Sequence, residues 1–263
     1  MIVWTAIGAG ALAFIISLLA TPLSRRVAQK FAMLDLPQRH KAHARATPLL
    51  GGSAIFAAVL GPSLLALSLA RIWSARQMPP WLPVDLHAYI RGAAMKTPMA
   101  LGILAGAAVL HVVGLIDDRK HLGPWLKLIA QFAVATGVVL MWDVRVLTVA
   151  GGAISVLVSI VWIVVITNAF NFLDNMDGLA AGVAVICAAA LLGASASMGQ
   201  VFVTAWLCLL IGALVGFLPY NFPPASTFMG DAGSLVIGYL LAAVSYTHLR
   251  AHETSLHLVC RLL

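Results

Sequence analysis

The most constraining feature of the sequence is a succession of long, nearly uncharged apolar runs. About eight of them have the length of roughly 20 residues that a helix needs to cross a lipid bilayer. They lie near residues 2 to 22, 48 to 70, 98 to 116, 125 to 142, 155 to 171, 178 to 197, 201 to 219 and 232 to 246. Because 62% of the residues are hydrophobic and only 10% are charged, the composition excludes a soluble domain. The sequence therefore predicts an all-α, polytopic integral membrane helical bundle.

The loop charges predict how the chain is oriented. The loop "SRRVAQKFAMLDLPQRHKAHARA" after the first run carries six basic residues and one acidic residue, which marks it as cytoplasmic. The first run lacks the basic start and the cleavage site of a signal peptide and is expected to stay in the inner (plasma) membrane. The second long loop, residues 72 to 97, falls on the opposite side, where Trp73, Trp81 and Tyr89 suit an interfacial segment. A membrane partner is expected, and no nucleic acid.

Polar clusters interrupt the apolar pattern at four places. They are "RHKAHARATPLLGG", "GLIDDRKHLG", "NAFNFLDNMDGLAAG" and "YNFPPASTFMGDAGS". Since each crossing changes the side on which the next loop emerges, helix parity places all four on the cytoplasmic side. Carboxylates at a membrane boundary are costly to desolvate without a partner, so we expect the acids to converge on a shared cation. Five of the nine acidic residues lie in three of these clusters: Asp117, Asp118, Asp174, Asp177 and Asp231.

The chemistry that fits such a cluster is magnesium-assisted phosphoryl transfer. Magnesium takes hard oxygen ligands, commonly one or two carboxylates, with water and phosphate oxygens completing the octahedron. Five acids exceed the needs of one ion, so some of them would position substrate or act as a base. Asp174 and Asp177 would share a face if "LDNMDGLA" opened a helix. Nearby basic residues suit an anionic nucleotide or lipid phosphate; they are Arg39, Lys41, Arg45, Arg119 and Lys120.

Each cluster taken alone also has a purely structural interpretation. The acidic pair in "GLIDDRKHLG" is typical of a charged turn, and Asp231 is suited to capping a helix. Asn168 and Asn171 are of the kind that hydrogen-bond neighbouring membrane helices, and His111 is typical of a satisfied helix histidine. The functional interpretation depends on the joint occurrence of the clusters, in this order, on one side.

In that order, "RHKAHARATPLLGG", "GLIDDRKHLG", "TNAFNFLDNMDGLAAG" and "FMGDAGS" resemble the motifs of the polyprenyl-phosphate N-acetylhexosamine 1-phosphate transferases, also known as glycosyltransferase family 4. The first motif is closer to the GlcNAc-type branch than to the branch of phospho-MurNAc-pentapeptide transferase. The resemblance implies that polyprenyl phosphate attacks the sugar-bearing phosphate of a UDP-N-acetylhexosamine, which releases UMP and forms a lipid diphosphate sugar for a cell-envelope polymer. It also implies a Mg²⁺ cofactor, for which Mn²⁺ can substitute, an active site that faces the cytoplasm and, by analogy, a homodimer.

The resemblance assigns roles residue by residue. Asp117 and Asp118 match the family's paired aspartates and are the expected catalytic residues, as general base toward the lipid phosphate and part of the metal environment. The expected metal ligands are Asp231, Asp174 and Asp177. The expected substrate-binding residues are Lys41, His43, Thr47, Asn168, Asn171 and Gly230. Asn175 stands where many members have glycine, a tolerable change because asparagine adopts left-handed conformations more readily than most residues.

Two other functional classes fit parts of the pattern. The stretch "DNMDGLAA" begins like the signature of the CDP-alcohol phosphotransferases, but that signature needs arginine where Ala181 stands and two further aspartates, which are absent between Asp177 and Asp231. An ion-coupled transporter would bind its ion near the membrane midplane, whereas these acids lie at helix ends. Both alternatives are disfavoured.

The composition changes abruptly after Val244, where "SYTHLRAHETSLHLVCRLL" begins. We therefore divide the chain into a membrane transferase domain, residues 1–244, and an atypical tail, residues 245–263. A metal pair of His248 and His252 lacks further ligands, and an amphipathic surface helix is an alternative. The favoured interpretation is a truncation or sequence-assembly scar in place of the family's C-terminal helices, so that this chain alone is expected to have little activity.

Overall fold

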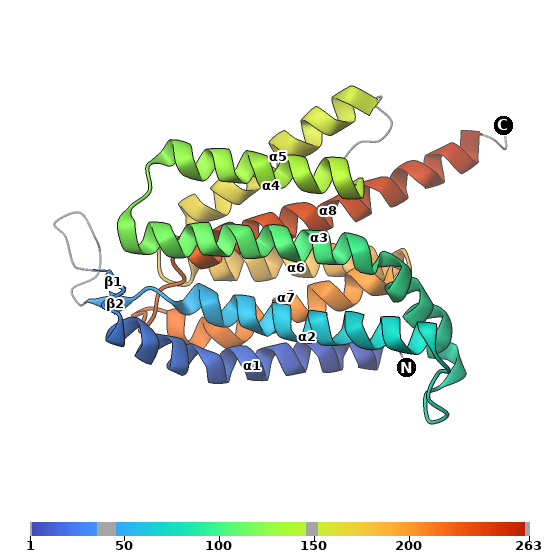
Figure 1. Ribbon diagram of the computed structural model, residues 1–263, viewed down its shortest axis with the longest axis horizontal. Helices are drawn as coiled ribbons and strands as arrows, with labels where there is room; N and C mark the ends of the chain where they lie inside the picture. Colours follow the sequence, from blue (N-terminus) through green and yellow to red (C-terminus); the bar gives the residue numbers. More distant parts are fainter. Residues whose placement is uncertain (1, 36–45, 146–151, 261–263) are drawn as a thin grey trace.

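The computed structural model describes residues 2–35, 46–145 and 152–260, with side chains from residue 4 to residue 245 within those ranges. These residues form eight helices and one short hairpin (Figure 1). The helices are α1 (Ile2–Lys30), α2 (Gly51–Ala75), α3 (Val84–Lys120), α4 (Pro124–Trp142), α5 (Gly152–Leu173), α6 (Leu179–Ser197), α7 (Val201–Asn221) and α8 (Asp231–Cys260). Strands β1 (Leu34–Asp35) and β2 (Thr47–Pro48) pair antiparallel. The predicted all-α bundle is confirmed.

Seven of these helices, α1 to α7, are long and apolar enough to cross a membrane. The apolar part of α8, Asp231–Ser245, is shorter. Many large apolar side chains on the outside of the bundle are exposed, among them Leu19, Ile129 and Ile186. Exposure of so many apolar side chains to water would be unfavourable, whereas the hydrocarbon of a lipid bilayer can surround them. The chain is a multi-pass membrane protein.

Three helices extend well beyond their apolar runs. Helix α1 continues to Lys30 rather than ending near residue 22, α3 begins at Val84 rather than near residue 98, and α8 continues to Cys260 rather than ending near residue 246. Much of the segment that was expected to be an interfacial loop is therefore helical. Pro98 lies inside α3, and Figure 1 shows that the first part of this helix bends away from the rest. Hydropathy detects only the apolar part of a helix, whereas main-chain hydrogen bonding continues it into polar residues.

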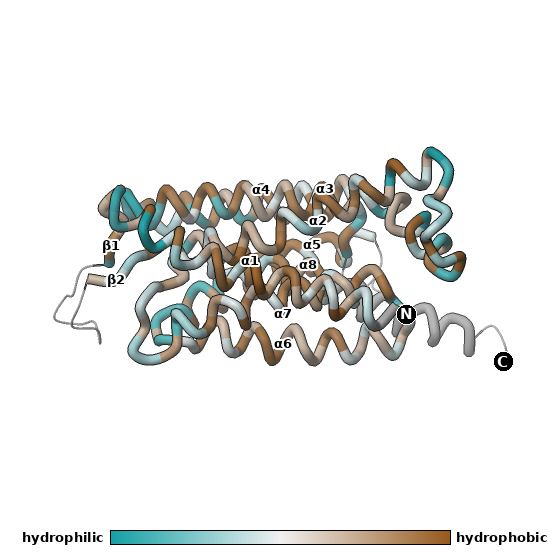
Figure 2. Tube along the Cα trace, turned by 90° about the horizontal axis from the view of Figure 1, so that it is seen from below, coloured by the Kyte–Doolittle hydropathy of each residue, from teal (hydrophilic) through white to brown (hydrophobic). Residues whose placement is uncertain are grey.

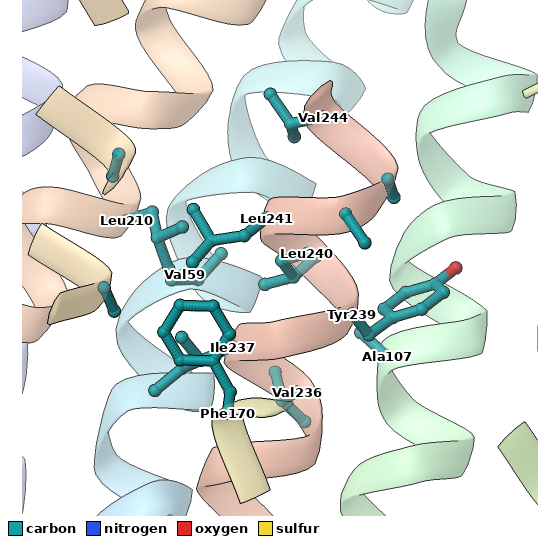
Figure 3. Packing of buried hydrophobic residues seen from close by; sticks show 14 of the residues in the cluster. Val59, Ala107, Phe170, Leu210, Val236, Ile237, Tyr239, Leu240, Leu241 and Val244 are labelled. Atoms are coloured by element: carbon teal, nitrogen blue, oxygen red, sulfur yellow. The ribbon is translucent and has the colours of Figure 1, made fainter. Parts of the chain in front are cut away.

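Helix α8 occupies the centre of the bundle. It packs against α2, α3, α5 and α6, and every residue from Ala232 to Val244 is buried. Figure 3 shows Tyr239 directed toward α3, while Leu241 lies on the side of Val59 and Leu210. Because the part of α8 from Ala232 to Val244 is enclosed by its neighbours, its first residue, Asp231, is surrounded by several helix ends.

The described parts of the four polar clusters lie at one end of the bundle, as parity predicts. Figure 1 shows the hairpin, the start of α2 and the α3–α4 turn together at that end, with the start of α8 close by. Figure 2 shows hydrophilic residues concentrated there and, at the opposite end, around the α2–α3 connection. The helices between the two ends are mainly apolar. The facing of the cluster end toward the cytoplasm stays a prediction.

Candidate active site

The site is built where the loop before α8 docks on the first turn of α2. The backbone N–H groups of Gly51 and Gly52 donate to the carbonyl oxygens of Phe228 and Met229, at 3.0 and 2.9 Å. The first N–H groups of a helix have no partner within the helix, and here the loop provides one. A Cβ at Gly52 would lie 2.3 Å from the Cα of Gly233, so glycine is needed for this close approach. The contact determines where α8 begins.

Asp118 holds the first turn of α8. Its carboxylate accepts hydrogen bonds from the backbone N–H of Asp231 at 2.8 Å and of Ala232 at 3.2 Å. Gly230, one of the predicted substrate-binding residues, has a φ of +72° and turns the chain into the helix beside this carboxylate. A carboxylate at a helix N-terminus satisfies unpaired N–H groups and interacts favourably with the helix dipole. Asp118 therefore sets the position of Asp231.

A lysine that the sequence analysis did not single out joins two of the predicted site residues. The Nζ atom of Lys127, in the first turn of α4, lies 2.9 Å from Asp117 Oδ2 and 2.7 Å from Asp231 Oδ2. The side chain of Lys127 is 22% exposed, that of Asp117 11% and that of Asp231 23%, so water screens these ion pairs only partly. The sequence signal for Lys127 was its position as a lone charge inside the apolar run from 125 to 142.

Asn171 connects α5 to the same carboxylate. Its Nδ2 atom donates to Asp231 Oδ1 at 2.9 Å and also lies 2.9 Å from the hydroxyl of Ser234. Asp231 thus has Lys127 on one carboxylate oxygen and Asn171 on the other. The predicted residues Asp117, Asp118, Asn171 and Asp231 are brought together from three helices, as the sequence interpretation required.

Asp174 lies beside this group, immediately after α5. Burial, followed by the negative charges of Asp231 and Asp118, raises the pKa of its carboxyl well above the ordinary value. A hydrogen bond from the backbone of Gly230 acts in the opposite direction. The charges of Asp231 and Asp118 therefore act on Asp174 together with its burial, which places Asp174 electrostatically beside the cluster.

Asp177 has a separate role in this structure. Its Oδ2 atom accepts a hydrogen bond from the backbone N–H of Ala225 at 2.9 Å, which ties the α5–α6 turn to the loop before α8. The stretch from Asp174 to Gly178 is a turn, and α6 begins only at Leu179, so the two acids do not share a helix face. The left-handed Gly178, with a φ of +72°, breaks the helix that the sequence interpretation considered.

The remaining predicted substrate-binding residues fall in different places. Asn168 and Gln131 bond each other through both side-chain amides, and Asn168 also donates to the carbonyl of Val164 at 2.8 Å. This amide pair joins α4 to α5, which is the structural interpretation of Asn168. Thr47 is buried in β2, at 5% exposure. Lys41 and His43 lie outside the described residues.

The cluster is suited to binding a cation between α3, α4 and α8. Asp117 and Asp231 already share the ammonium group of Lys127. Asp117 Oδ1 is buried and has no hydrogen-bond partner among the described residues. Within those residues, no three His, Cys, Asp or Glu side chains are grouped closely enough to hold a metal ion by themselves. A divalent cation would therefore take two protein carboxylates and complete its shell with water or phosphate oxygens, as magnesium commonly does.

Comparison with known proteins identifies relatives of this chain. The chain is 34% identical over 245 residues to the probable undecaprenyl-phosphate N-acetylglucosaminyl 1-phosphate transferase of Bacillus subtilis, which covers 89% of this chain and 61% of the relative. It is 35% identical over 256 residues to the decaprenyl-phosphate N-acetylglucosaminephosphotransferase of Mycobacterium tuberculosis. That match covers 90% of this chain and 59% of the relative. A phospho-N-acetylmuramoyl-pentapeptide-transferase of Limosilactobacillus fermentum is 37% identical over 181 residues. That match covers 64% of this chain and 53% of the relative.

The chain spans about three fifths of the length of the first two of these relatives. The family model described as glycosyl transferase family 4 matches residues 100–248, a segment that contains Asp117, Asp118, Lys127, Asn171 and Asp231. Since this match covers more than half of the 263 residues, the chain belongs to glycosyl transferase family 4.

Proposed function

We propose that the full-length protein transfers an N-acetylhexosamine 1-phosphate, of the GlcNAc type, from a UDP-sugar to a polyprenyl phosphate. The observation that carries this proposal is the cluster of Asp117, Asp231, Lys127 and Asn171 at one end of a membrane bundle. Such a position suits a reaction between a lipid phosphate, which stays in the bilayer, and a water-soluble nucleotide. The two relatives described above whose names specify N-acetylglucosamine act on undecaprenyl and decaprenyl phosphates.

The reaction exchanges one phosphorus–oxygen bond for another. An oxygen of the polyprenyl phosphate forms a bond to the β-phosphorus of the UDP-sugar. The bond from that phosphorus to the oxygen bridging the two phosphates breaks, and UMP leaves with the bridging oxygen. The products are UMP and a polyprenyl diphosphate sugar. The protein must hold both anions in line and offset charge on the transferred phosphoryl group.

The residues of the cluster are suited to these tasks. One buried carboxylate oxygen of Asp117 has no hydrogen-bond partner in the described part of the chain, which makes this residue the candidate base toward a protonated lipid phosphate. Lys127 is the candidate for contact with the negative phosphoryl oxygens, because it is a partly exposed cation between two carboxylates. Asp118 keeps α8 and hence Asp231 in place through its hydrogen bonds to the helix N-terminus.

Magnesium is the proposed cofactor, with manganese as a substitute. Asp117 and Asp231 would hold it, with Asp174 nearby, since carboxylates are the ligands that this hard cation prefers. When bound, it would offset the negative charge of the diphosphate. Lys127 bridges the same two carboxylates and would give up at least one of these contacts to the ion.

The proposed location is the inner (plasma) membrane, with the active site facing the cytoplasm, where nucleotide sugars are made. The basic composition of the loop after α1, which leads into the same end of the bundle, supports this orientation. The product would serve cell-envelope polymer synthesis. The homodimer that the resemblance implies is tested by cross-linking in native membranes.

The test is conversion of radiolabelled UDP-sugars in detergent. The purified full-length protein is incubated with polyprenyl phosphate, Mg²⁺ and, in separate reactions, UDP-GlcNAc, UDP-GalNAc and UDP-MurNAc-pentapeptide. Thin-layer chromatography should show a labelled lipid with UDP-GlcNAc and equimolar release of UMP, and EDTA should abolish both. Labelled lipid only with UDP-MurNAc-pentapeptide would reject the GlcNAc-type assignment, and no lipid with any donor would reject the proposed function.

A further inference from the structure

Helix α3 contacts the first turn of α8 through one face, formed by His111, Gly114 and Asp118. Their spacing of three and four residues places them on the same side of a helix. A Cβ at Gly114 would lie 2.4 Å from the Cα of Ala232, so the two backbones touch at this point. The polar residues on either side of Gly114 both bond the backbone of α8.

The peptide groups of Ala232 are held on both sides by this face. The N–H of Ala232 donates to Asp118 Oδ2 at 3.2 Å, and its carbonyl oxygen lies 2.9 Å from Nδ1 of His111. Since a carbonyl oxygen can only accept, Nδ1 carries the proton. In the neutral ring Nε2 is then an acceptor, and it lies 3.3 Å from the hydroxyl of Ser53 on α2. One histidine therefore joins α2, α3 and α8.

The position of the His111 ring is restricted by packing. The residue is 8% exposed, and its ring stacks on Phe56 with 4.5 Å between the ring centroids and 27° between the ring planes. Because the ring cannot move freely, its hydrogen bond restrains the position of the carbonyl oxygen that it contacts. The bonded carbonyl belongs to the residue directly after Asp231.

We infer that His111 is a positioning residue for Asp231. By holding the Ala232 carbonyl while Asp118 holds the N–H, it orients the first turn of α8 so that the Asp231 carboxylate faces Lys127 and Asn171. The inference rests on the proposed function, in which Asp231 is needed for turnover. It gives His111 a function, whereas the sequence indicated only a satisfied helix histidine.

The test compares two substitutions of similar shape in the full-length protein. His111→Asn retains an N–H donor close to the position of Nδ1, whereas His111→Leu replaces that donor by a methyl group. Both lose the stacked ring, so packing changes are matched. The leucine variant should lower kcat about 10- to 100-fold with less than about a threefold change in KM for the UDP-sugar, and the asparagine variant should recover most of the loss. His111→Phe keeps the ring and serves as the donor-free variant if His111→Leu does not fold.

A second readout does not depend on activity. Magnesium added without substrates should raise the Tm of the unaltered protein and of His111→Asn more than that of His111→Leu, because a displaced Asp231 binds the ion less well. The matched control is His87→Leu. His87 also bonds a backbone carbonyl, that of Leu82 at 3.3 Å, but it lies in the first part of α3, away from the site. This control should change neither kcat nor the magnesium-dependent rise in Tm.

Three outcomes decide the matter. Equal losses in the leucine and asparagine variants would show that ring packing, and not the hydrogen bond, is what counts, and would overturn the inference. Unchanged kcat and magnesium response in the leucine variant would overturn it as well. If the unaltered protein transfers no sugar phosphate, the proposed function fails, and the magnesium-dependent Tm of the variants then decides alone whether His111 positions Asp231.

Discussion

The two ends of the helix bundle are both polar, but their polar residues are held in different ways. At the active-site end, carboxylates, an ammonium group and an amide bond one another across α3, α4, α5 and α8. At the opposite end, Trp73 meets Trp81 edge to face, and Lys96 lies 5.9 Å from the ring centroid of Phe202. An ion pair at that end, between Arg145 and Asp143, joins residues only two positions apart in the sequence. Asp85 and Arg91, on the first part of α3, are exposed at that end.

The difference shows what the polar groups at each end contribute. An exposed charged side chain at the membrane surface stays hydrated, so replacing it by a neutral residue changes stability little. A buried charge is retained only with partners, and a set of partners drawn from four helices ties the site to the packing of the bundle. Substitutions of the same kind at the two ends should therefore have very different effects on activity.

The largest expected effect is that of Asp231→Asn compared with Asp85→Asn. The first removes the negative charge that faces Lys127 and the proposed magnesium ion, so turnover should fall by about three orders of magnitude or more while the protein still folds. The second changes an exposed acid in the first turn of α3 and should leave turnover within about a factor of two. Sugar-phosphate transfer by the purified variants measures both, and normal turnover by Asp231→Asn would remove that residue from the mechanism.

A smaller difference is expected between Lys127→Met and Lys96→Met. Methionine preserves the length of the lysine side chain but leaves Asp117 and Asp231 without their shared cation, so kcat should fall by about two orders of magnitude. Lys96 is exposed at the opposite end, and its replacement should have little effect. Steady-state kinetics with varied UDP-sugar are the measurement. Equal activity in both variants would mean that Lys127 only balances charge.

The next effect is on stability, and it compares two glycines of α3. Gly114→Ala would place a Cβ against the backbone of Ala232 and should destabilise the protein by about 1–3 kcal/mol, because neither backbone can move away cheaply. A Cβ at Gly92, in the first part of the same helix, meets no atom within 4 Å. Gly92→Ala should leave the Tm unchanged or raise it slightly, since alanine favours helix. Thermal unfolding in detergent distinguishes them, and a normal Tm for Gly114→Ala would contradict the tight contact.

The smallest effect on the protein is expected from single cysteines introduced to determine which end of the bundle faces the cytoplasm. Lys30 ends α1 at the active-site end, and Ala75 ends α2 at the other; both are exposed. In a background without the native cysteines, Lys30→Cys should be shielded from an impermeant thiol reagent in intact cells, while Ala75→Cys reacts. Both variants should keep normal activity. Labelling of position 30 from outside would invert the proposed orientation.

The candidate site could be predicted only in part. The paired acids at 117 and 118 and the acid at 231 were found because carboxylates are conspicuous in a chain with 10% charged residues. Lys127 was missed, although a lone lysine in an apolar run carries the same kind of signal. The separate partners of Asp174 and Asp177 could not have been foreseen, because they depend on a left-handed glycine and on the fold of a distant loop.

The sequence by itself determined the order of the apolar helices and, approximately, their number, and it placed the polar clusters at one end. These properties depend on the local density of apolar residues and on counting crossings, and both can be read along the chain. The tertiary structure alone decided that Asp118 caps α8, that Lys127 joins Asp117 to Asp231, and that His111 holds Ala232. Each of these contacts links residues that are far apart in the sequence or lie on different helices, and helix packing around α8, with glycine at its closest points, brings them within hydrogen-bonding distance.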